Sequence, residues 1–226
     1  MARAALDCKI SKTREHERGG TMVHGYHVIW GMYGFWLPND PRGSWSDFVA
    51  HWELLRFGTA THVGTKPEWI TPARSNWRCA ARSTLKYPAV TLTGEQALSV
   101  ANGFATLVQK SGLTVWACAI MPEHVHLVIA RHRYEVEQMC NLLKGAATKQ
   151  LKADRLHPQS SFSQDGKLPS MWSEGQWKSY LDSESAIEAA IHYVEQNPIR
   201  EGKRLQCWSW VTPFAGIHRA GWTTYH

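Results

Sequence analysis

The order of apolar and polar residues predicts four strands and three helices between residues 26 and 197. Aromatic and β-branched runs, or alternation of apolar with polar residues, predict strands at 26–36, 113–120, 124–129 and 176–181. Apolar residues recur every three or four positions in the segments that we expect to be helical, which are 94–111, 136–151 and 185–197.

Helix boundaries are marked by short polar motifs. Thr93 with Gln96, and Ser185 with Glu188, have the spacing of a capping box, in which each side chain satisfies a backbone N–H at the start of a helix. Gly112 should end the first of these helices, and the last should end before Pro198.

This order of elements is strand, helix, strand, strand, helix, strand and an additional helix. It predicts an α+β fold of the ferredoxin-like, split βαβ type, in which two helices cover one face of an antiparallel sheet. We expect a basic, mobile tail at 1–22, a main domain at 23–202 with an irregular insertion at 44–90, and a C-terminal extension at 203–226. The insertion is interpreted either as a loop-rich flap over the sheet or as a flap that contacts DNA.

Two histidines alternate along the strand at 124–129. His124 and His126 should point to one face and Val125, Leu127 and Ile129 to the other, because successive side chains of a strand alternate. Their roots lie roughly 7 Å apart, so both rings can converge on one cation or phosphate. The motif is therefore a candidate metal site, although a solvated polar face would give the same pattern.

A tyrosine and an amide share one face of the last predicted helix. Tyr193 and Asn197 are separated by one helical turn, with the small Ala186, Ala189 and Ala190 nearby. A tyrosine at an interface and an asparagine that ends a helix are the ordinary explanations for these residues.

The composition favours a polyanionic partner. The 226 residues have a formal net charge of +6 and include 12 tryptophans, a combination suited to phosphates and unpaired bases. Candidate phosphate contacts are Arg131, Arg133, Lys144, Lys149, Lys152, Arg200, Lys203 and Arg204. Trp208, Trp210 and Trp222 are candidates for stacking on bases or for packing the C-terminal extension.

Other features of the sequence predict a cytoplasmic protein, associated with the nucleoid. No apolar run approaches the roughly 20 residues that span a bilayer, and the first 20 residues lack an apolar signal segment. The five cysteines are scattered without a CxxC pair, so neither a disulfide framework nor a structural zinc site is expected.

The histidine and tyrosine motifs together resemble a known family. Met121-Pro122-Glu123-His124-Val125-His126-Leu127, followed by the helix from Ile191 to Gly202, is similar to the single-tyrosine HUH transposases. It is most similar to the REP-associated tyrosine transposases, whose last helix carries a tyrosine four residues before an Asn-Pro. The resemblance spans about 26–202, and the 44–90 insertion and the 157–175 loop are longer than in the minimal family domain.

The resemblance implies a fold, an activity and a set of site residues. Tyr193 would be the nucleophile, and His124, His126 and Asn197 would hold Mg²⁺ or Mn²⁺. The enzyme would cleave and rejoin single-stranded DNA at hairpin-forming palindromes through a 5′-phosphotyrosine, as a monomer or a homodimer. The alternative is a non-catalytic DNA- or RNA-binding protein of ferredoxin-like fold.

Overall fold

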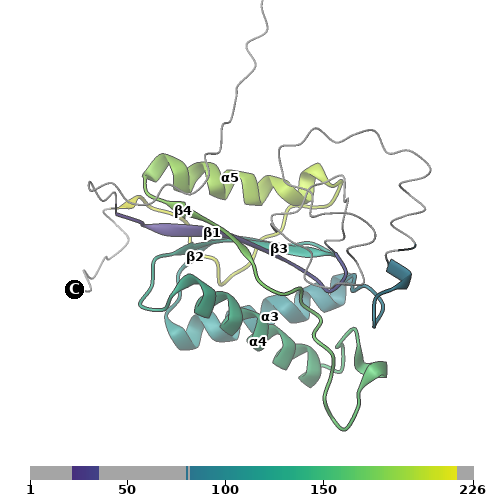
Figure 1. The fold of residues 1–226 in the computed structure, drawn as a ribbon. Coiled ribbons are helices and arrows are strands. Elements are labelled where there is room, and N and C mark those ends of the chain that lie inside the picture. The colour runs from purple at the N-terminus through teal and green to yellow at the C-terminus, as the bar shows by residue number, and fades with distance from the viewer. Residues whose placement is uncertain (1–21, 36–79, 81, 218–226) are drawn as a thin grey trace, which may run out of the picture.

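An antiparallel sheet of four strands forms the centre of the molecule, with helices on both of its faces (Figure 1). The computed structural model describes residues 22–35, 80 and 82–217. The strand order is β2-β3-β1-β4, and each neighbouring pair is antiparallel. The strands are β1 (Gly25–Gly31), β2 (Val115–Ile120), β3 (His124–Ala130) and β4 (Trp177–Leu181).

Two helices cover one face of the sheet and a third covers the other. α3 (Gly94–Ser111) and α4 (Val136–Ala153) pack against each other below the sheet in Figure 1, and α5 (Glu184–Arg200) lies above it. A short 3-10 helix, η1 (Ser160–Phe162), follows α4. The order of elements and the antiparallel pairing confirm the predicted ferredoxin-like α+β fold with an additional C-terminal helix.

The predicted start and end of α3 are confirmed. The Thr93 hydroxyl accepts from the Gln96 N–H at 3.2 Å, and the Gln96 side chain accepts from the Thr93 N–H at 2.9 Å. Gly112 follows in the left-handed region at φ 71°, which a side chain would disfavour.

Both predicted ends of α5 are wrong. Ser183, and not Ser185, is the N-cap, because its hydroxyl accepts from the Ala186 N–H at 3.3 Å. The helix also continues through Pro198 to Arg200. Pro198 lacks only its own N–H, and its carbonyl still accepts from the Lys203 N–H at 2.8 Å, so the last turn persists.

Alternation along the strands gives the sheet two apolar faces. Val125, Leu127 and Ile129 join the core under α3 and α4, together with Trp30 and Phe104. Val128 lies on the opposite face, in a smaller core that Ile187 and Val194 of α5 complete. His124 and His126 belong to this second face, as the alternation predicted.

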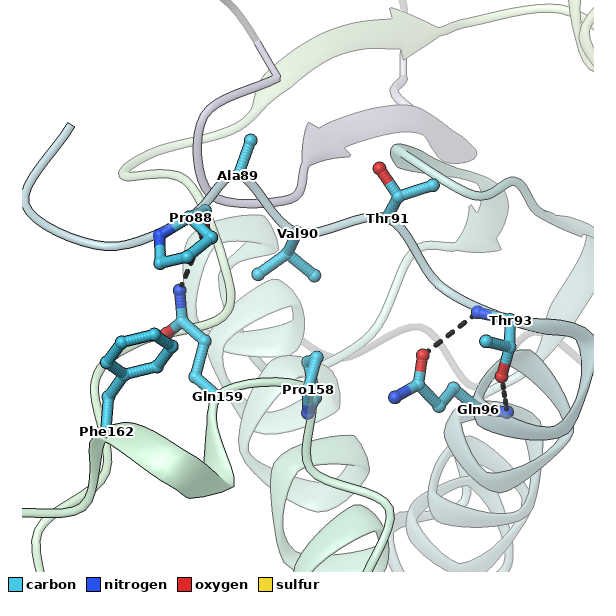
Figure 2. A pocket seen from close by; sticks show the side chains of 9 residues that line it. All are labelled: Pro88, Ala89, Val90, Thr91, Thr93, Gln96, Pro158, Gln159 and Phe162. Carbon is cyan, nitrogen blue, oxygen red and sulfur yellow. Dashed lines mark hydrogen bonds between the residues drawn. The ribbon is translucent and has the colours of Figure 1, made fainter. Parts of the chain in front are cut away.

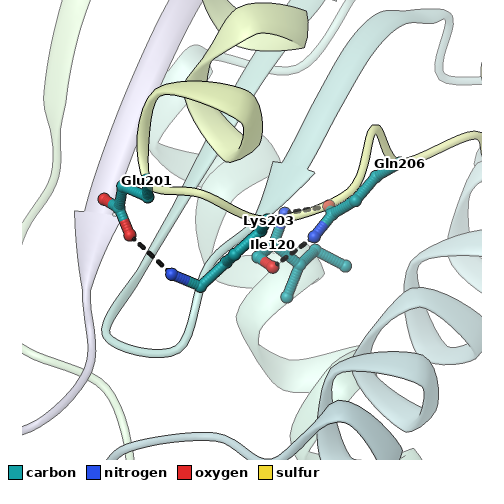
Figure 3. A network of polar contacts seen from close by, with 4 residues as sticks. All are labelled: Ile120, Glu201, Lys203 and Gln206. Atoms are coloured by element: carbon teal, nitrogen blue, oxygen red, sulfur yellow. Dashed lines mark hydrogen bonds and ion pairs between the residues drawn. The ribbon is translucent and has the colours of Figure 1, made fainter.

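The chain after α5 lies along the edge strand β2. The Gln206 side chain accepts from the Ile120 N–H and donates to the Ile120 carbonyl, each at 2.8 Å, while Lys203 pairs with Glu201 at the surface (Figure 3). Farther on, the Thr212 N–H donates to the Val115 carbonyl at 2.8 Å. These bonds satisfy edge groups that would otherwise be open to another strand.

Two of the tryptophans in this C-terminal segment contribute to packing. Trp208 and Trp210 lie against the core under α3, and the Trp210 ring centroid is 6.0 Å from that of Phe104. Their contacts therefore favour the packing interpretation over base stacking, and Trp222 lies outside the described residues.

Several predictions of domain organisation concern residues that are not described. Of the predicted tail at 1–22, only Met22 is described. Of the predicted insertion at 44–90, residues 44–79 and 81 lie outside the described part of the chain. Within the described part of the chain, no helix has the length and apolar character needed to cross a membrane.

Candidate active site

The two histidines of β3 lie side by side on the face that α5 covers. Their ring centroids are 4.9 Å apart and the ring planes are nearly perpendicular, at 75°. His126 is buried, with 4% of its surface exposed, whereas His124 is half-buried at the start of the strand. The Phe35 ring stacks on His124 at 5.0 Å and 15°, forming an apolar wall on that side.

A third histidine, which the sequence analysis missed, completes this cluster. β1 pairs with β3 so that Ile29 lies opposite His126, which places His27 on the same face, one diagonal step away. The His27 Nε2 and His126 Nδ1 atoms are 3.3 Å apart, within hydrogen-bond distance. A single polar residue inside the apolar strand 26–30 is the signal that could have identified it.

Tyr193 of α5 lies against this cluster. Its ring centroid is 5.7 Å from that of His27 and 5.8 Å from that of His126, in edge-on arrangements. The tyrosine is 41% exposed, so it touches buried imidazoles and solvent at once. α5 holds it there because Ile187 and Val194, both fully buried, fix the side of the helix that faces the sheet.

Tyr180 of β4 lies on the opposite face of the sheet. It pairs with Tyr26 across β1 and β4, and their ring centroids are 5.8 Å apart. Tyr26 belongs to the core under α3 and α4. The sheet therefore separates Tyr180 from the three histidines.

Asn197 lies one helical turn after Tyr193 on α5. Its Nδ2 atom is buried and has no hydrogen-bond partner among the described residues. A buried amide group without a partner is uncommon, because removing it from water costs free energy that a hydrogen bond normally offsets. An acceptor on a bound ligand, such as a phosphate oxygen, would give this N–H group a partner.

Burial keeps the histidines next to Tyr193 neutral at neutral pH. Desolvation lowers the pKa of His27 to about 4. Desolvation also lowers the pKa of His126 well below its usual value, with smaller contributions from the charges of His124 and His27. A neutral imidazole retains a lone pair on one ring nitrogen, which is the state that binds a metal ion.

The donor set fits a divalent ion held by nitrogen and amide oxygen. His124 and His126 supply two adjacent imidazoles, and Asn197 on the covering helix carries a side-chain oxygen of the kind that binds hard cations. No cluster of three or more His, Cys, Asp or Glu suited to a metal occurs in the part of the chain that the structure describes. A third protein ligand from the described residues would therefore be an amide and not a carboxylate. With so few protein ligands, the remaining coordination positions would be open to water or substrate.

The predicted phosphate contacts divide into three groups. Lys144 is buried, and its ammonium donates to the Gly175 carbonyl at 2.6 Å and lies 5.6 Å from the Trp30 ring centroid, so its prediction as a phosphate contact is wrong. Arg200 lies beside the site, with its guanidinium 5.2 Å from the Tyr193 ring centroid, and Lys203 and Arg204 follow it at the exposed end of α5. The third group of predicted contacts is exposed and lies after β3 or on α4; it consists of Arg131, Arg133, Lys149 and Lys152.

A separate pocket of about 220 Å³ lies at the beginning of α3 (Figure 2). Its walls include Thr93, Pro158 and Phe162, and the Gln159 amide donates to the Pro88 carbonyl at 3.4 Å across it. α3 covers the face of the sheet opposite α5, so this pocket is distinct from the histidine cluster.

Comparisons with known proteins identify the family. Two solved structures are similar: a candidate transposase from Deinococcus radiodurans, at 15% identity over 81% of this chain and 97% of that chain (TM-score 0.41), and a REP-associated tyrosine transposase bound to a REP hairpin, at 11% identity over 84% of this chain and 75% of that chain (TM-score 0.42). A comparison with curated proteins found no match. The family model described as "Transposase IS200 like" matches residues 81–197, just over half of the chain, including the histidine strand and α5. The chain therefore belongs to the IS200-like transposase family.

Proposed function

We propose that this member of the family is a metal-dependent enzyme that cleaves and rejoins single-stranded DNA, with Tyr193 as the nucleophile. The observation that carries the proposal is the contact of the Tyr193 ring with His27 and His126, at 5.7 and 5.8 Å between ring centroids. The tyrosine and the histidine strand are far apart in sequence. Their meeting on one face of the sheet supports a shared site.

The proposed step is an attack by the phenol oxygen on a backbone phosphorus. The new bond joins the Tyr193 oxygen to phosphorus, the bond from phosphorus to the 3′ oxygen breaks, and the proton lost by the phenol is balanced by the one that the leaving 3′ hydroxyl gains. The products are a 5′-phosphotyrosine and a free 3′ hydroxyl. A 3′ hydroxyl can reverse the step on the same or another strand, so joining needs no nucleotide cofactor.

A tyrosine needs assistance for this reaction, because a phenol with a reference pKa near 10 is mostly protonated at neutral pH. We propose that His124, His126 and the Asn197 side-chain oxygen hold Mg²⁺ or Mn²⁺. When bound, the ion would polarise the scissile phosphate and stabilise charge on the leaving oxygen. The burial of His126 supports this role, since its lowered pKa keeps that imidazole neutral and available as a ligand.

The cations at the end of α5 are the proposed contacts to the DNA backbone. Arg200 is already against the Tyr193 ring, and exposed Lys203 and Arg204 extend positive charge away from it. One of the similar structures contains a REP hairpin, which supports a hairpin-bearing strand as the substrate to test first. The exposed cations after β3 and on α4 remain predicted contacts.

The test is formation of a covalent adduct. The full-length protein is incubated with Mg²⁺ or Mn²⁺ and a single-stranded DNA that carries a hairpin and a label at its 3′ end, because the proposed adduct retains that part of the strand. We expect a labelled protein band that survives denaturation, is absent in Tyr193→Phe and disappears on chelation. Tyr180→Phe is the matched control, because this tyrosine is exposed on the other face, and it should form the adduct normally.

Two outcomes would contradict the proposal. An adduct of normal yield in Tyr193→Phe would show that another residue is the nucleophile. DNA binding without an adduct, over a range of hairpins and in both metals, would favour the non-catalytic nucleic-acid-binding alternative.

A further inference from the structure

We propose that His27 is a positioning residue that fixes the tautomer of His126, by accepting a hydrogen bond from the His126 Nδ1–H. The inference rests on the proposed function, because it assumes that His126 is a metal ligand. It adds a role for a residue on β1, a strand that carries neither the nucleophile nor the proposed ligands.

The geometry leaves one arrangement of protons that suits a ligand. His126 Nδ1 is 3.3 Å from His27 Nε2, so this hydrogen bond engages Nδ1 and leaves Nε2 as the nitrogen for an ion. A neutral imidazole carries one N–H, and a ligating nitrogen cannot be the one that carries it. Nδ1 of His126 must then be the donor and His27 Nε2 the acceptor, as in other sites where a second group orients a metal-bound histidine.

Burial makes His27 difficult to replace by water. The two histidines are only 8% and 4% exposed, so little solvent reaches the atoms between them. Without its acceptor, the Nδ1–H of His126 would be left unsatisfied in an apolar environment, and the other tautomer, with its proton on Nε2, would become competitive. That tautomer cannot bind an ion through Nε2.

The surroundings hold the His27 ring in place. The Trp177 ring packs edge-on against it at 5.3 Å between centroids, and Tyr193 approaches from α5 at 5.7 Å. β1 fixes its position, since His27 pairs with Val128 on one side and Ser179 on the other. The ring is therefore oriented independently of any ion.

The test compares substitutions that separate the hydrogen bond from packing. His27→Phe keeps an aromatic ring against Trp177 and Tyr193 but removes the acceptor. His27→Gln places an amide near the position of Nε2, whereas the shorter amide of His27→Asn falls closer to the position of Nδ1. His192→Phe is the control, because this histidine is next to Tyr193 in sequence but exposed on α5.

Two readouts on the full-length protein are used. The ¹⁵N chemical shifts of His126 report its tautomer without metal or DNA, and Mn²⁺ titration followed by electron paramagnetic resonance reports affinity. We expect His27→Phe to lose the pure Nδ1–H state and to weaken Mn²⁺ binding about 10- to 100-fold, as is typical when an outer hydrogen-bond partner of a ligand is removed. His27→Gln should restore both better than His27→Asn, and His192→Phe should match the native protein.

The proposal is overturned if His126 keeps the Nδ1–H tautomer in His27→Phe, or if Gln and Asn lower Mn²⁺ affinity as much as Phe does, which would indicate packing alone. If His27→Phe does not fold, the comparison of the Gln and Asn variants by ¹⁵N shift decides. A native protein that holds the Nδ1–H tautomer but binds no Mn²⁺ would overturn the proposed ligands, and the role of His27 at a metal site with them. Loss of the Tyr193 adduct leaves the tautomer readout unaffected, so the failures can be told apart.

Discussion

The contact between α3 and α4 makes a sharp prediction about two glycines in helix interiors. A Cβ atom added to Gly103 of α3 would lie 2.7 Å from the Ala147 Cα, 2.8 Å from the Ala146 oxygen and 2.9 Å from the Ala147 nitrogen. All three are backbone atoms of α4, which cannot rotate away. A Cβ added to Gly145, in the middle of α4, meets no atom within 4 Å. The two positions therefore share helical context but differ in the space around them.

The expected changes in the free energy of unfolding have opposite signs. Replacing glycine by alanine inside a helix stabilises by about 0.5–1 kcal/mol. Gly145→Ala should show this gain. In Gly103→Ala the gain is opposed by overpacking, which costs about 1–3 kcal/mol, and contacts with immobile backbone favour the upper part of that range. We expect Gly103→Ala to be less stable than the native protein by about 1–2 kcal/mol.

Urea denaturation followed by circular dichroism measures both variants against the native protein. A change in stability alone shifts the midpoint and leaves the dependence on urea unchanged. The reasoning is refuted if Gly103→Ala is as stable as Gly145→Ala, because the helices would then separate without cost.

Three further predictions follow from buried groups. Burial lowers the pKa of His27 to about 4 in the folded protein, from a value of about 6.5 in the unfolded chain. Between about pH 6.5 and pH 4, the unfolded chain therefore binds a proton at His27 that the folded chain excludes. The free energy of unfolding of the metal-free protein should fall as pH falls through this window, by up to about 3 kcal/mol from His27, and His27→Gln in urea titrations should lack that part of the loss. Burial raises the pKa of the Cys140 thiol to about 12 and that of the Cys118 thiol well above its usual value. Iodoacetamide at mildly alkaline pH should therefore modify exposed Cys207 and leave Cys118 and Cys140 unmodified, as measured by peptide mass spectrometry. Rapid modification of Cys140 would contradict its burial. Gln206→Ala removes both side-chain partners of the buried Ile120 backbone and should lower the free energy of unfolding by about 1–3 kcal/mol in thermal or urea unfolding. Lys203→Ala breaks only an exposed ion pair and should lower it by less than about 1 kcal/mol. Equal losses would show that the Gln206 bonds stabilise the fold no more than the exposed ion pair does.

The sequence predicted the elements whose signals are local. The Thr93–Gln96 capping box and Gly112 defined α3, and alternation assigned His124 and His126 to the face opposite Leu127. The family was also recognised from two short motifs, which the family model confirms. These features depend on residues close together in the chain, or on motifs that can be matched without knowing the packing.

The features that the sequence did not predict depend on pairing across the fold. A lone polar residue in an apolar strand singles out His27, but only the pairing of Ile29 with His126 shows that it joins the site. Lys144 resembles the surface cations of α4 in sequence, but its side chain crosses Trp30 to reach the Gly175 carbonyl. The sequence assigned the cap of α5 to Ser185, but in the structure the Ser183 hydroxyl accepts from the Ala186 N–H. The roles assigned to Tyr193 and Asn197 stay predictions until the adduct is tested.

α5 is anchored at both ends, and this anchoring affects whether Tyr193 can reach the site of a second copy of the protein. One end continues directly from β4, at one margin of the sheet, while the chain beyond the other end is bonded through Gln206 and Thr212 to β2, at the far margin. Transfer of Tyr193 to a second copy of the protein would require both Gln206 bonds and the Thr212 bond to break. If Tyr193 is the nucleophile proposed above, the arrangement described presents its phenol to the histidines of its own chain, without an exchange of helices.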